Sequence, residues 1–118
     1  MPVRIEDINP QDVWLVRLND TEQYEMSGTR PVIVVAVHRQ ANQVMGSPCS
    51  SVLASGRFAY SHQISPTAGN GLTQESIVKV YQTRTLTLSR FIRKMGEADD
   101  DDFESVKTLL SDYCGLDD

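Results

Sequence analysis

The side chains best suited to chemistry in this 118-residue chain are its arginines, because a guanidinium can hold a phosphate through two parallel hydrogen bonds. Residues 1–94 carry ten lysines and arginines against seven acids, a balance of +3. Eight of those ten cations are arginines: Arg4, Arg17, Arg30, Arg39, Arg57, Arg84, Arg90 and Arg93. Residues 95–118 carry one lysine against nine acids, so the formal net charge of −5 hides a mildly basic body. A phosphate-binding surface and an ordinary solvated surface both fit this distribution.

Other reactive side chains give weaker indications of a site. The chain has two histidines, His38 and His62, and two cysteines, Cys49 and Cys114, without a paired metal-ligand spacing. The sequence therefore lacks the residue spacing expected for a zinc site or for Cys-His catalysis. Distant cysteines are typical of buried or inert free thiols in a reducing compartment, which favours the cytoplasm. Aspartates 99–102 are expected to begin a helix, whose dipole favours acids there, rather than to bind a metal.

Several function classes are excluded by missing motifs. The chain has no phosphate-binding P-loop, no dinucleotide fingerprint, no H-E-x-x-H motif and no nucleophile elbow. The longest apolar run is residues 31–37, whereas a membrane span needs about 20 apolar residues. The first ten residues contain no hydrophobic stretch typical of a secretory signal. We therefore expect one cytoplasmic domain, residues 1–118, without a membrane contact.

The elements that must position these residues read mostly as strands. The predicted strands are 13–18, 31–37, 44–53, 58–64 and 76–82, with a long loop at 19–28. Residues 31–37 form a β-branched run typical of a strand buried on both faces. Gly46 and Pro48 interrupt the next segment, which predicts a bent or edge strand. These five or so strands predict one strongly bent sheet, closed as a barrel.

Helical spacing occurs twice near the C-terminus. Apolar residues within 88–95 fall at the spacing of a short helix, which Gly96 would end. Apolar residues within 103–113 predict a longer amphipathic helix, with Asp99 or Asp100 as its N-cap.

Short motifs follow one another in a fixed order along the chain. They are D-V-W at 12–14, E-M-S-G-T-R-P at 25–31 before the hydrophobic strand, S-P-C-S-S at 47–51, N-G-L with E-S-I-V within 70–78, and Q-T-R-T at 82–85. This order and spacing resemble the MazF/PemK family of toxin endoribonucleases, over about residues 11–113. The resemblance implies a mainly β fold with one helix, a small SH3-like barrel of the CcdB/PemK type with a C-terminal amphipathic helix. It also implies a homodimer and a late strand over 90–96, which would reduce the helix suggested at 88–95 to one turn.

The resemblance implies the toxin component of a type II toxin-antitoxin module. Such a toxin, an mRNA interferase, cuts single-stranded RNA at short sequences without metal or cofactor, leaving a 2',3'-cyclic phosphate and a 5'-hydroxyl. By motif position, Arg30, Ser50 and Glu25 would be catalytic, and Ser51, Gln82 and Arg84 would contact RNA. Arg30 would stabilise the charged phosphorane, and Pro31 restricts its backbone. Ser50 would hold a non-bridging phosphate oxygen, and Glu25 would act as the general base.

Three positions depart from the family pattern. Ser50 stands where the family has threonine, so the hydroxyl is kept without the stiff β-branched side chain that would fix it. Met26 stands where the family has glutamine. Thr87 stands where the family commonly has an aspartate that has been assigned as a general base, so that role does not transfer.

The resemblance also implies partners and leaves alternatives open. A cognate MazE-like antitoxin would lay an acidic, disordered tail across the basic groove that binds RNA. A non-catalytic toxin on the same fold would instead bind a protein such as DNA gyrase, since fold does not settle function. That toxin would depend on the C-terminal helix and the last residues rather than on Arg30 and Ser50. A toxin that has lost its activity is the third alternative.

Overall fold

The computed structural model describes residues 2–18 and 28–116. Its elements, in chain order, are η1 (Ile5–Asp7), β1 (Asp12–Leu18), β2 (Gly28–His38), β3 (Gln43–Ser50), η2 (Leu53–Arg57), β4 (Ser61–Ile64), β5 (Ser76–Lys79), η3 (Val80–Gln82), β6 (Arg84–Thr87), η4 (Leu88–Arg90), β7 (Phe91–Glu97) and α1 (Asp100–Cys114). The η elements are short 3-10 turns. None of the described helices is long and apolar enough to cross a membrane.

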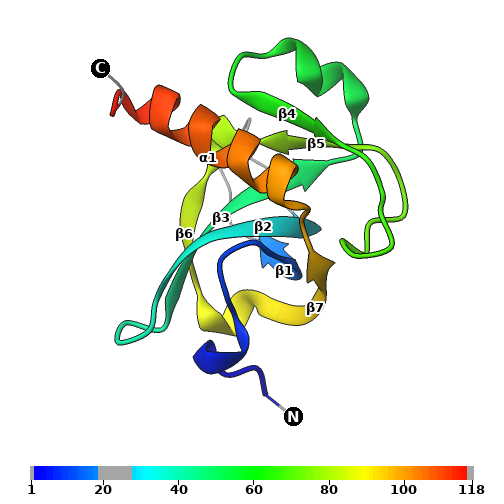
Figure 1. The fold of residues 1–118 in the computed structure, drawn as a ribbon. Coiled ribbons are helices and arrows are strands. Elements are labelled where there is room, and N and C mark those ends of the chain that lie inside the picture. The colour runs from blue at the N-terminus through cyan, green and yellow to red at the C-terminus, as the bar shows by residue number, and fades with distance from the viewer. Residues whose placement is uncertain (1, 19–27, 117–118) are drawn as a thin grey trace.

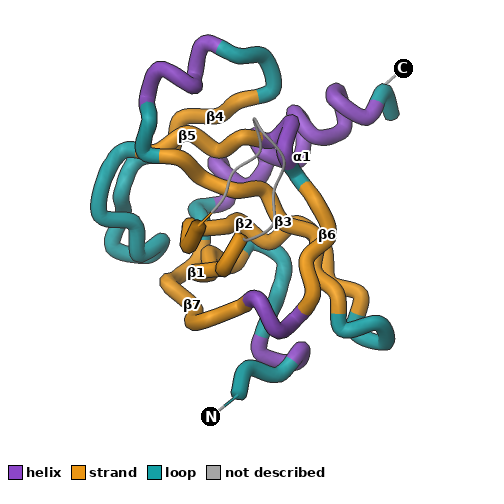
Figure 2. The backbone as a smooth tube through the Cα atoms, turned by 180° about the vertical axis from the view of Figure 1, so that it is seen from behind, coloured by secondary structure: helices purple, strands orange, loops and turns teal. Residues whose placement is uncertain are grey.

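The strands form one antiparallel sheet with the order β4-β5-β3-β2-β1-β7. β3 changes partners along its length, because its first half pairs with β6 and its end pairs with β5. Figure 1 shows β4, β5 and α1 in the upper part of the molecule and β1, β7 and the N-terminal segment in the lower part. Figure 2 shows the same division from behind. The predicted β-rich fold with a C-terminal helix is confirmed, although no pairing among the described strands joins β4 to β7 to close the barrel.

Strands β1 and β2 bury both of their faces, which gives the sheet two cores. Below the sheet, a lower core contains Ile5, Ile8, Trp14, Val16, Leu18, Val32, Val34, Val44, Leu86 and Phe91. On the other face, an upper core beneath α1 contains Val13, Ile33, Cys49, Ile64, Leu72, Val78, Val80, Ala98, Phe103 and Val106. Since side chains alternate along a strand, consecutive residues of β2 enter different cores. The predicted burial on both faces is confirmed for Val32, Ile33 and Val34.

Several predicted boundaries are wrong because tertiary contacts override the local pattern. The segment predicted as a bent or edge strand at 44–53 is an interior strand that ends at Ser50, and its pairing with β2 has a register shift between Val34 and Ala36. The strand predicted at 58–64 begins only at Ser61, after η2 and a left-handed Tyr60 (φ 60°). The strand predicted at 76–82 turns into η3 after Lys79.

Of the two segments with helical spacing near the C-terminus, only the second forms a helix. The helix indicated by the spacing within 88–95 is wrong beyond one turn, because Phe91 packs edge-on against Trp14 at 6.0 Å and β7 pairs with β1. The late strand implied by the family resemblance is confirmed. The predicted C-terminal helix is also confirmed as α1, which buries Phe103 and Val106. Asp99 occupies the N-cap position, but its side chain makes no capping hydrogen bond.

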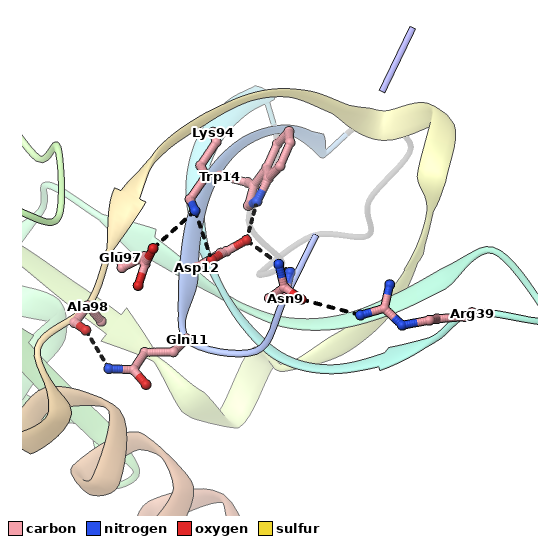
Figure 3. Close-up of polar contacts among 8 residues, drawn as sticks. All are labelled: Asn9, Gln11, Asp12, Trp14, Arg39, Lys94, Glu97 and Ala98. Atoms are coloured by element: carbon pink, nitrogen blue, oxygen red, sulfur yellow. Dashed lines mark hydrogen bonds and ion pairs between the residues drawn. The ribbon is translucent and has the colours of Figure 1, made fainter. Parts of the chain in front are cut away.

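A buried carboxylate joins the N-terminal segment to β1 and β7 (Figure 3). Asp12, 2% exposed, accepts hydrogen bonds from Trp14 Nε1 at 3.0 Å and from the Asn9 backbone N–H at 2.9 Å. Its other oxygen lies 3.3 Å from Lys94 Nζ on β7, and Lys94 also pairs with Glu97. Burial opposes the charge of Lys94, but Glu97 and Asp12 outweigh it and raise its pKa.

We expect Asp12→Ala to lower the free energy of unfolding by about 2–4 kcal/mol, because the buried Trp14 N–H and the Lys94 ammonium would lose their acceptor. Urea unfolding at fixed protein concentration measures the change. Glu97→Ala is the matched control, since it removes the exposed partner of the same lysine and should cost less than about 1 kcal/mol. Equal losses in the two variants would contradict a structural role for the buried carboxylate.

The two cysteines should differ in reactivity. Cys49 lies in the upper core, where burial raises its pKa to about 12, while Cys114 is exposed at the end of α1. At pH 8 we expect one thiol per native chain to react with a disulfide reagent and two to react in urea, because the thiolate is the reactive form. Cys114→Ser should remove the fast reaction. A fast-reacting thiol in the native Cys114→Ser protein would show that the upper core does not enclose Cys49.

Candidate functional site

The ladder between β2 and β3 ends where two prolines lie near each other. Val32 and Pro48 form the last pair of this ladder, and Pro31 precedes Val32. Beyond it, β2 continues with β1, where Arg30 lies opposite Val16, and β3 continues with β5. Because proline has no N–H to donate, it cannot extend a ladder in the usual way. The two strands part at this point and leave a gap in the sheet.

A pocket of about 180 Å³ opens in this gap. Its described lining residues are Thr29, Arg30 and Pro31 from β2, Cys49 and Ser51 from the end of β3, Leu72, Thr73, Gln74 and Ser76 before and at β5, and Met95 from β7. Arg30 is the only charged side chain among them. The remaining lining combines hydroxyl and amide groups with apolar side chains, a composition suited to binding a planar, polar ring.

Arg30 has a second cation beside it. Burial lowers the pKa of Lys79, at the end of β5, and the charge of Arg30 lowers it further. The effect of Arg30 on Lys79 indicates two cations that interact at this end of the sheet. The sequence reasoning did not single out Lys79. The signal was its position directly after the apolar Val78, since consecutive residues of a strand face opposite sides and Val78 lies in the upper core.

Two hydroxyl groups lie at the same end of β3. Ser50 is 5% exposed, and its Oγ accepts a hydrogen bond from the Val52 backbone N–H at 3.1 Å. A hydroxyl that accepts this bond still has its own hydrogen to donate. Ser51 is exposed and lines the pocket. The thiol of Cys49, which also lines the pocket, is held protonated by burial, so it is no nucleophile.

The pocket wall before β5 is fixed by a loop that docks on β7. Buried Asn70 accepts hydrogen bonds from the backbone N–H groups of Thr67 and Leu72 and donates to the Ser65 carbonyl at 2.9 Å. Gly71 has a φ of 73°, and a Cβ there would strike the Met95 carbonyl oxygen. In the sequence, Asn70 and Gly71 belong to the N-G-L motif. The structure shows that this turn carries Leu72, Thr73 and Gln74 to the pocket.

Two further residues predicted for the site lie elsewhere. Gln82 belongs to η3 and Arg84 begins β6, opposite Gly46, and neither lines the pocket. Glu25 and Met26 lie outside the described residues.

Thr87 is remote from the gap. It pairs with Gln43, which pairs with His38 at the other end of β2. Eight residues of extended strand separate His38 from Arg30, a length of about 26 Å. Within one chain, this position is therefore remote from the phosphate that Arg30 would hold.

The acidic residues do not converge into a cluster. In residues 2–18 and 28–116, no group of three or more His, Cys, Asp or Glu side chains is arranged to hold a metal ion. Asp100, Asp101 and Asp102 form the first turn of α1, as the sequence predicted for a helix entry. Asp102 also joins the helix to β4 through a hydrogen bond between its Oδ1 and His62 Nε2 at 2.8 Å.

Both the sequence and the fold of this chain are similar to those of known proteins. The model of the family described as PemK-like, MazF-like toxin of type II toxin-antitoxin system matches residues 9–113. No curated protein sequence matches the chain significantly. The fold is similar to MazF (Form-I) from Deinococcus radiodurans, with a TM-score of 0.77 at 17% identity over 92% of this chain and 96% of that one.

Two mycobacterial structures share the fold. The Mycobacterium tuberculosis toxin MazF-mt6 gives a TM-score of 0.71 at 18% identity, covering 90% of this chain and 98% of that one. An endoribonuclease in complex with its cognate antitoxin from Mycobacterial species gives 0.70 at 18% identity, covering 99% and 98%. The family match over residues 9–113, together with this shared architecture, means that the chain belongs to the PemK-like, MazF-like toxins of type II toxin-antitoxin systems.

Proposed function

We propose that the chain is an endoribonuclease that cuts single-stranded RNA at a short sequence without a metal ion. One observation carries this proposal: the gap between β2 and β3 brings Arg30 to the hydroxyl-bearing end of β3 and beside Lys79. Two cations attract the phosphodiester backbone, and the neutral polar pocket next to them can accept a base.

The proposed reaction uses the RNA's own nucleophile. The ribose 2'-oxygen attacks the adjacent phosphorus and the bond from phosphorus to the 5'-oxygen breaks. The products are a 2',3'-cyclic phosphate and a 5'-hydroxyl. A base must take the 2'-proton, and the departing 5'-oxygen must receive one. Glu25 is the carboxylate that the motif offers as the base.

Arg30 and Ser50 would act on the phosphate itself. A guanidinium can donate two hydrogen bonds to the non-bridging oxygens, whose charge grows in the transition state. We assign Arg30 this electrostatic role, since a guanidinium gives up its protons reluctantly. Ser50 would donate its hydroxyl hydrogen to one of the same oxygens. Ser51 would contact the adjoining nucleotide in the pocket, and Gln82 and Arg84 would meet the RNA farther along the surface.

The proposed partners follow from the same charge distribution. A cognate antitoxin with an acidic segment would cover Arg30 and Lys79 and exclude RNA by occupying its binding surface. A complex of a fold neighbour with its cognate antitoxin supports this expectation. We propose a homodimer as the working unit, with each chain contributing one gap.

A non-catalytic toxin that binds DNA gyrase is the second candidate. The observation that favours it is the exposed end of α1, where Tyr113 is 51% and Leu116 is 75% exposed. Such a toxin would need these residues and would not need Arg30.

We expect the purified protein to cut a long, weakly structured RNA in excess EDTA, at one repeated short sequence that primer extension maps. Arg30→Ala should lower the cleavage rate by about 100-fold or more, because the lost guanidinium interaction acts mainly in the transition state. Arg30→Lys should recover part of the rate, since it restores the charge without the two-pronged geometry. Arg4→Ala, which removes a guanidinium 72% exposed near the N-terminus, is the control.

Two results would overturn the proposal. Cleavage that EDTA abolishes would rule out a metal-free mechanism. If the folded, dimeric wild-type protein does not cleave RNA, the endoribonuclease proposal is wrong. Binding of gyrase that depends on Tyr113 and Leu116 would then favour the second candidate.

Ser50→Ala should lower kcat/KM by about 10- to 100-fold, the loss of one hydrogen bond to a charged group. The fold should survive, because the orphaned Val52 N–H belongs to a residue 61% exposed to water. Ser50→Thr should retain activity because it keeps the hydroxyl, and Ser89→Ala, on η4, should leave the rate unchanged. Initial rates on a short RNA containing the mapped sequence measure all three. Full activity of Ser50→Ala would show that the Ser50 hydroxyl takes no part in catalysis.

A further inference from the structure

An exposed aromatic surface lies next to the proposed site and takes no part in the mechanism described above. It consists of Arg57, Phe58 and Tyr81. Phe58 follows η2 and is 48% exposed, and its ring centroid lies 6.1 Å from that of Tyr81. The Arg57 guanidinium stacks over the Phe58 ring at 4.5 Å, and Arg57 also donates a hydrogen bond to the Ala54 carbonyl. The ring is therefore held in place by two neighbours while much of it remains open to water.

This aromatic surface lies beside the face of β5 that carries Lys79. Val78 is fully buried in the upper core, so Ile77 and Lys79, which alternate with it in β5, face the other way. A Cβ on Gly56 of η2 would lie 3.0 Å from Ile77 Cδ1, so η2, which leads into Phe58, packs on that face. Tyr81 lies two residues after Lys79, in η3, and Lys79 is close enough to Arg30 for the charge of the arginine to lower its pKa. A surface thus runs from Arg30 and Lys79 to Tyr81 and Phe58.

The charge of this surface favours a polyanion. Within the described residues, the charged groups that act on Lys79 and Tyr81 are Arg30 and Arg57, and both are cations. Burial raises the pKa of Tyr81 and Arg57 offsets part of that rise, so the phenol stays neutral at physiological pH. Exposed aromatic rings set among cations are the arrangement by which proteins bind single-stranded nucleic acids, since bases stack on the rings while cations hold the phosphates.

We propose that Phe58, supported by Tyr81 and Arg57, is a stacking platform for an unpaired base that flanks the phosphate held at Arg30. The proposal rests on the proposed endoribonuclease function and adds a positioning residue to it. Stacking accepts any base because every base has a π-face, so Phe58 sets the path of the strand and not the sequence that is cut. The platform acts alike on bound substrate and transition state, and its loss therefore raises KM and leaves kcat nearly unchanged.

Steady-state cleavage of a short RNA containing the mapped sequence tests whether KM rises while kcat stays nearly unchanged. We expect Phe58→Ala to raise KM by roughly 5- to 100-fold, the range found when a base loses an aromatic partner. Phe58→Trp should keep the wild-type KM. Phe58→Leu should behave like Phe58→Ala, because leucine keeps apolar bulk and lacks the ring. Ile92→Ala, on β7 and 42% exposed in the wild type, is the matched apolar control. Equal thermal midpoints for all variants establish that none is unfolded.

A binding measurement separates the platform from catalysis. The chain has one tryptophan, Trp14, which is 4% exposed in the lower core, so Phe58→Trp adds a second tryptophan that reports on the surface. We expect an RNA with 2'-deoxyribose at the cleavage position, which lacks the nucleophile, to quench the fluorescence of Phe58→Trp and leave that of the wild type unchanged.

The outcomes distinguish the platform from the proposed function. Wild-type cleavage with an unchanged KM in Phe58→Ala, and no quenching in Phe58→Trp, overturns the platform and leaves the nuclease intact. The same result with weakened self-association of Phe58→Ala makes the surface a protein contact and also overturns the platform. A wild-type protein that neither cleaves nor binds RNA overturns the proposed function and the platform with it.

Discussion

The candidate site exists because the hydrogen-bonded ladder between β2 and β3 ends at the pair Val32 and Pro48. A sheet that continued past this pair would be closed there, with its backbone groups satisfied and its side chains packed. Pro31 and Pro48 remove two donors at the point of parting, and each strand then follows a different neighbour. The gap between them exposes Arg30 and the end of β3. A functional surface thus arises because hydrogen bonding stops at a defined pair of residues.

The rest of the fold holds the two sides of this gap in place. β1 and β2 are rigid because both faces are packed, with alternate side chains in the lower and upper cores. Asp12 ties β1 to β7, and β7 in turn supports the loop that carries Leu72 and Gln74 to the pocket. Contacts of β1 and β7 therefore support the walls of the gap.

The sheet also separates opposite charges. α1, with Asp100, Asp101 and Asp102 in its first turn, covers the upper core, while Arg30 and Lys79 face the other side. With a sheet thickness between them, the acids do not neutralise the cations, and the −8 balance of the C-terminal segment is compatible with a basic binding surface. Net charge alone gives the wrong impression of such a protein, because ligands respond to the local field.

The sequence by itself determined the family, the β-rich class, the buried run at 32–34 and the C-terminal helix, because motif order, β-branched runs and helical periodicity are local signals. It also named Arg30, Ser50 and Ser51. Only the tertiary structure decided that β3 is interior, that residues 91–97 form a strand, and that Lys79 lies beside Arg30 while Thr87 lies far from it. Short apolar segments fit a helix or a strand equally well, and only the partner available for pairing selects between them. Proximity across strands likewise depends on register, which no local pattern encodes.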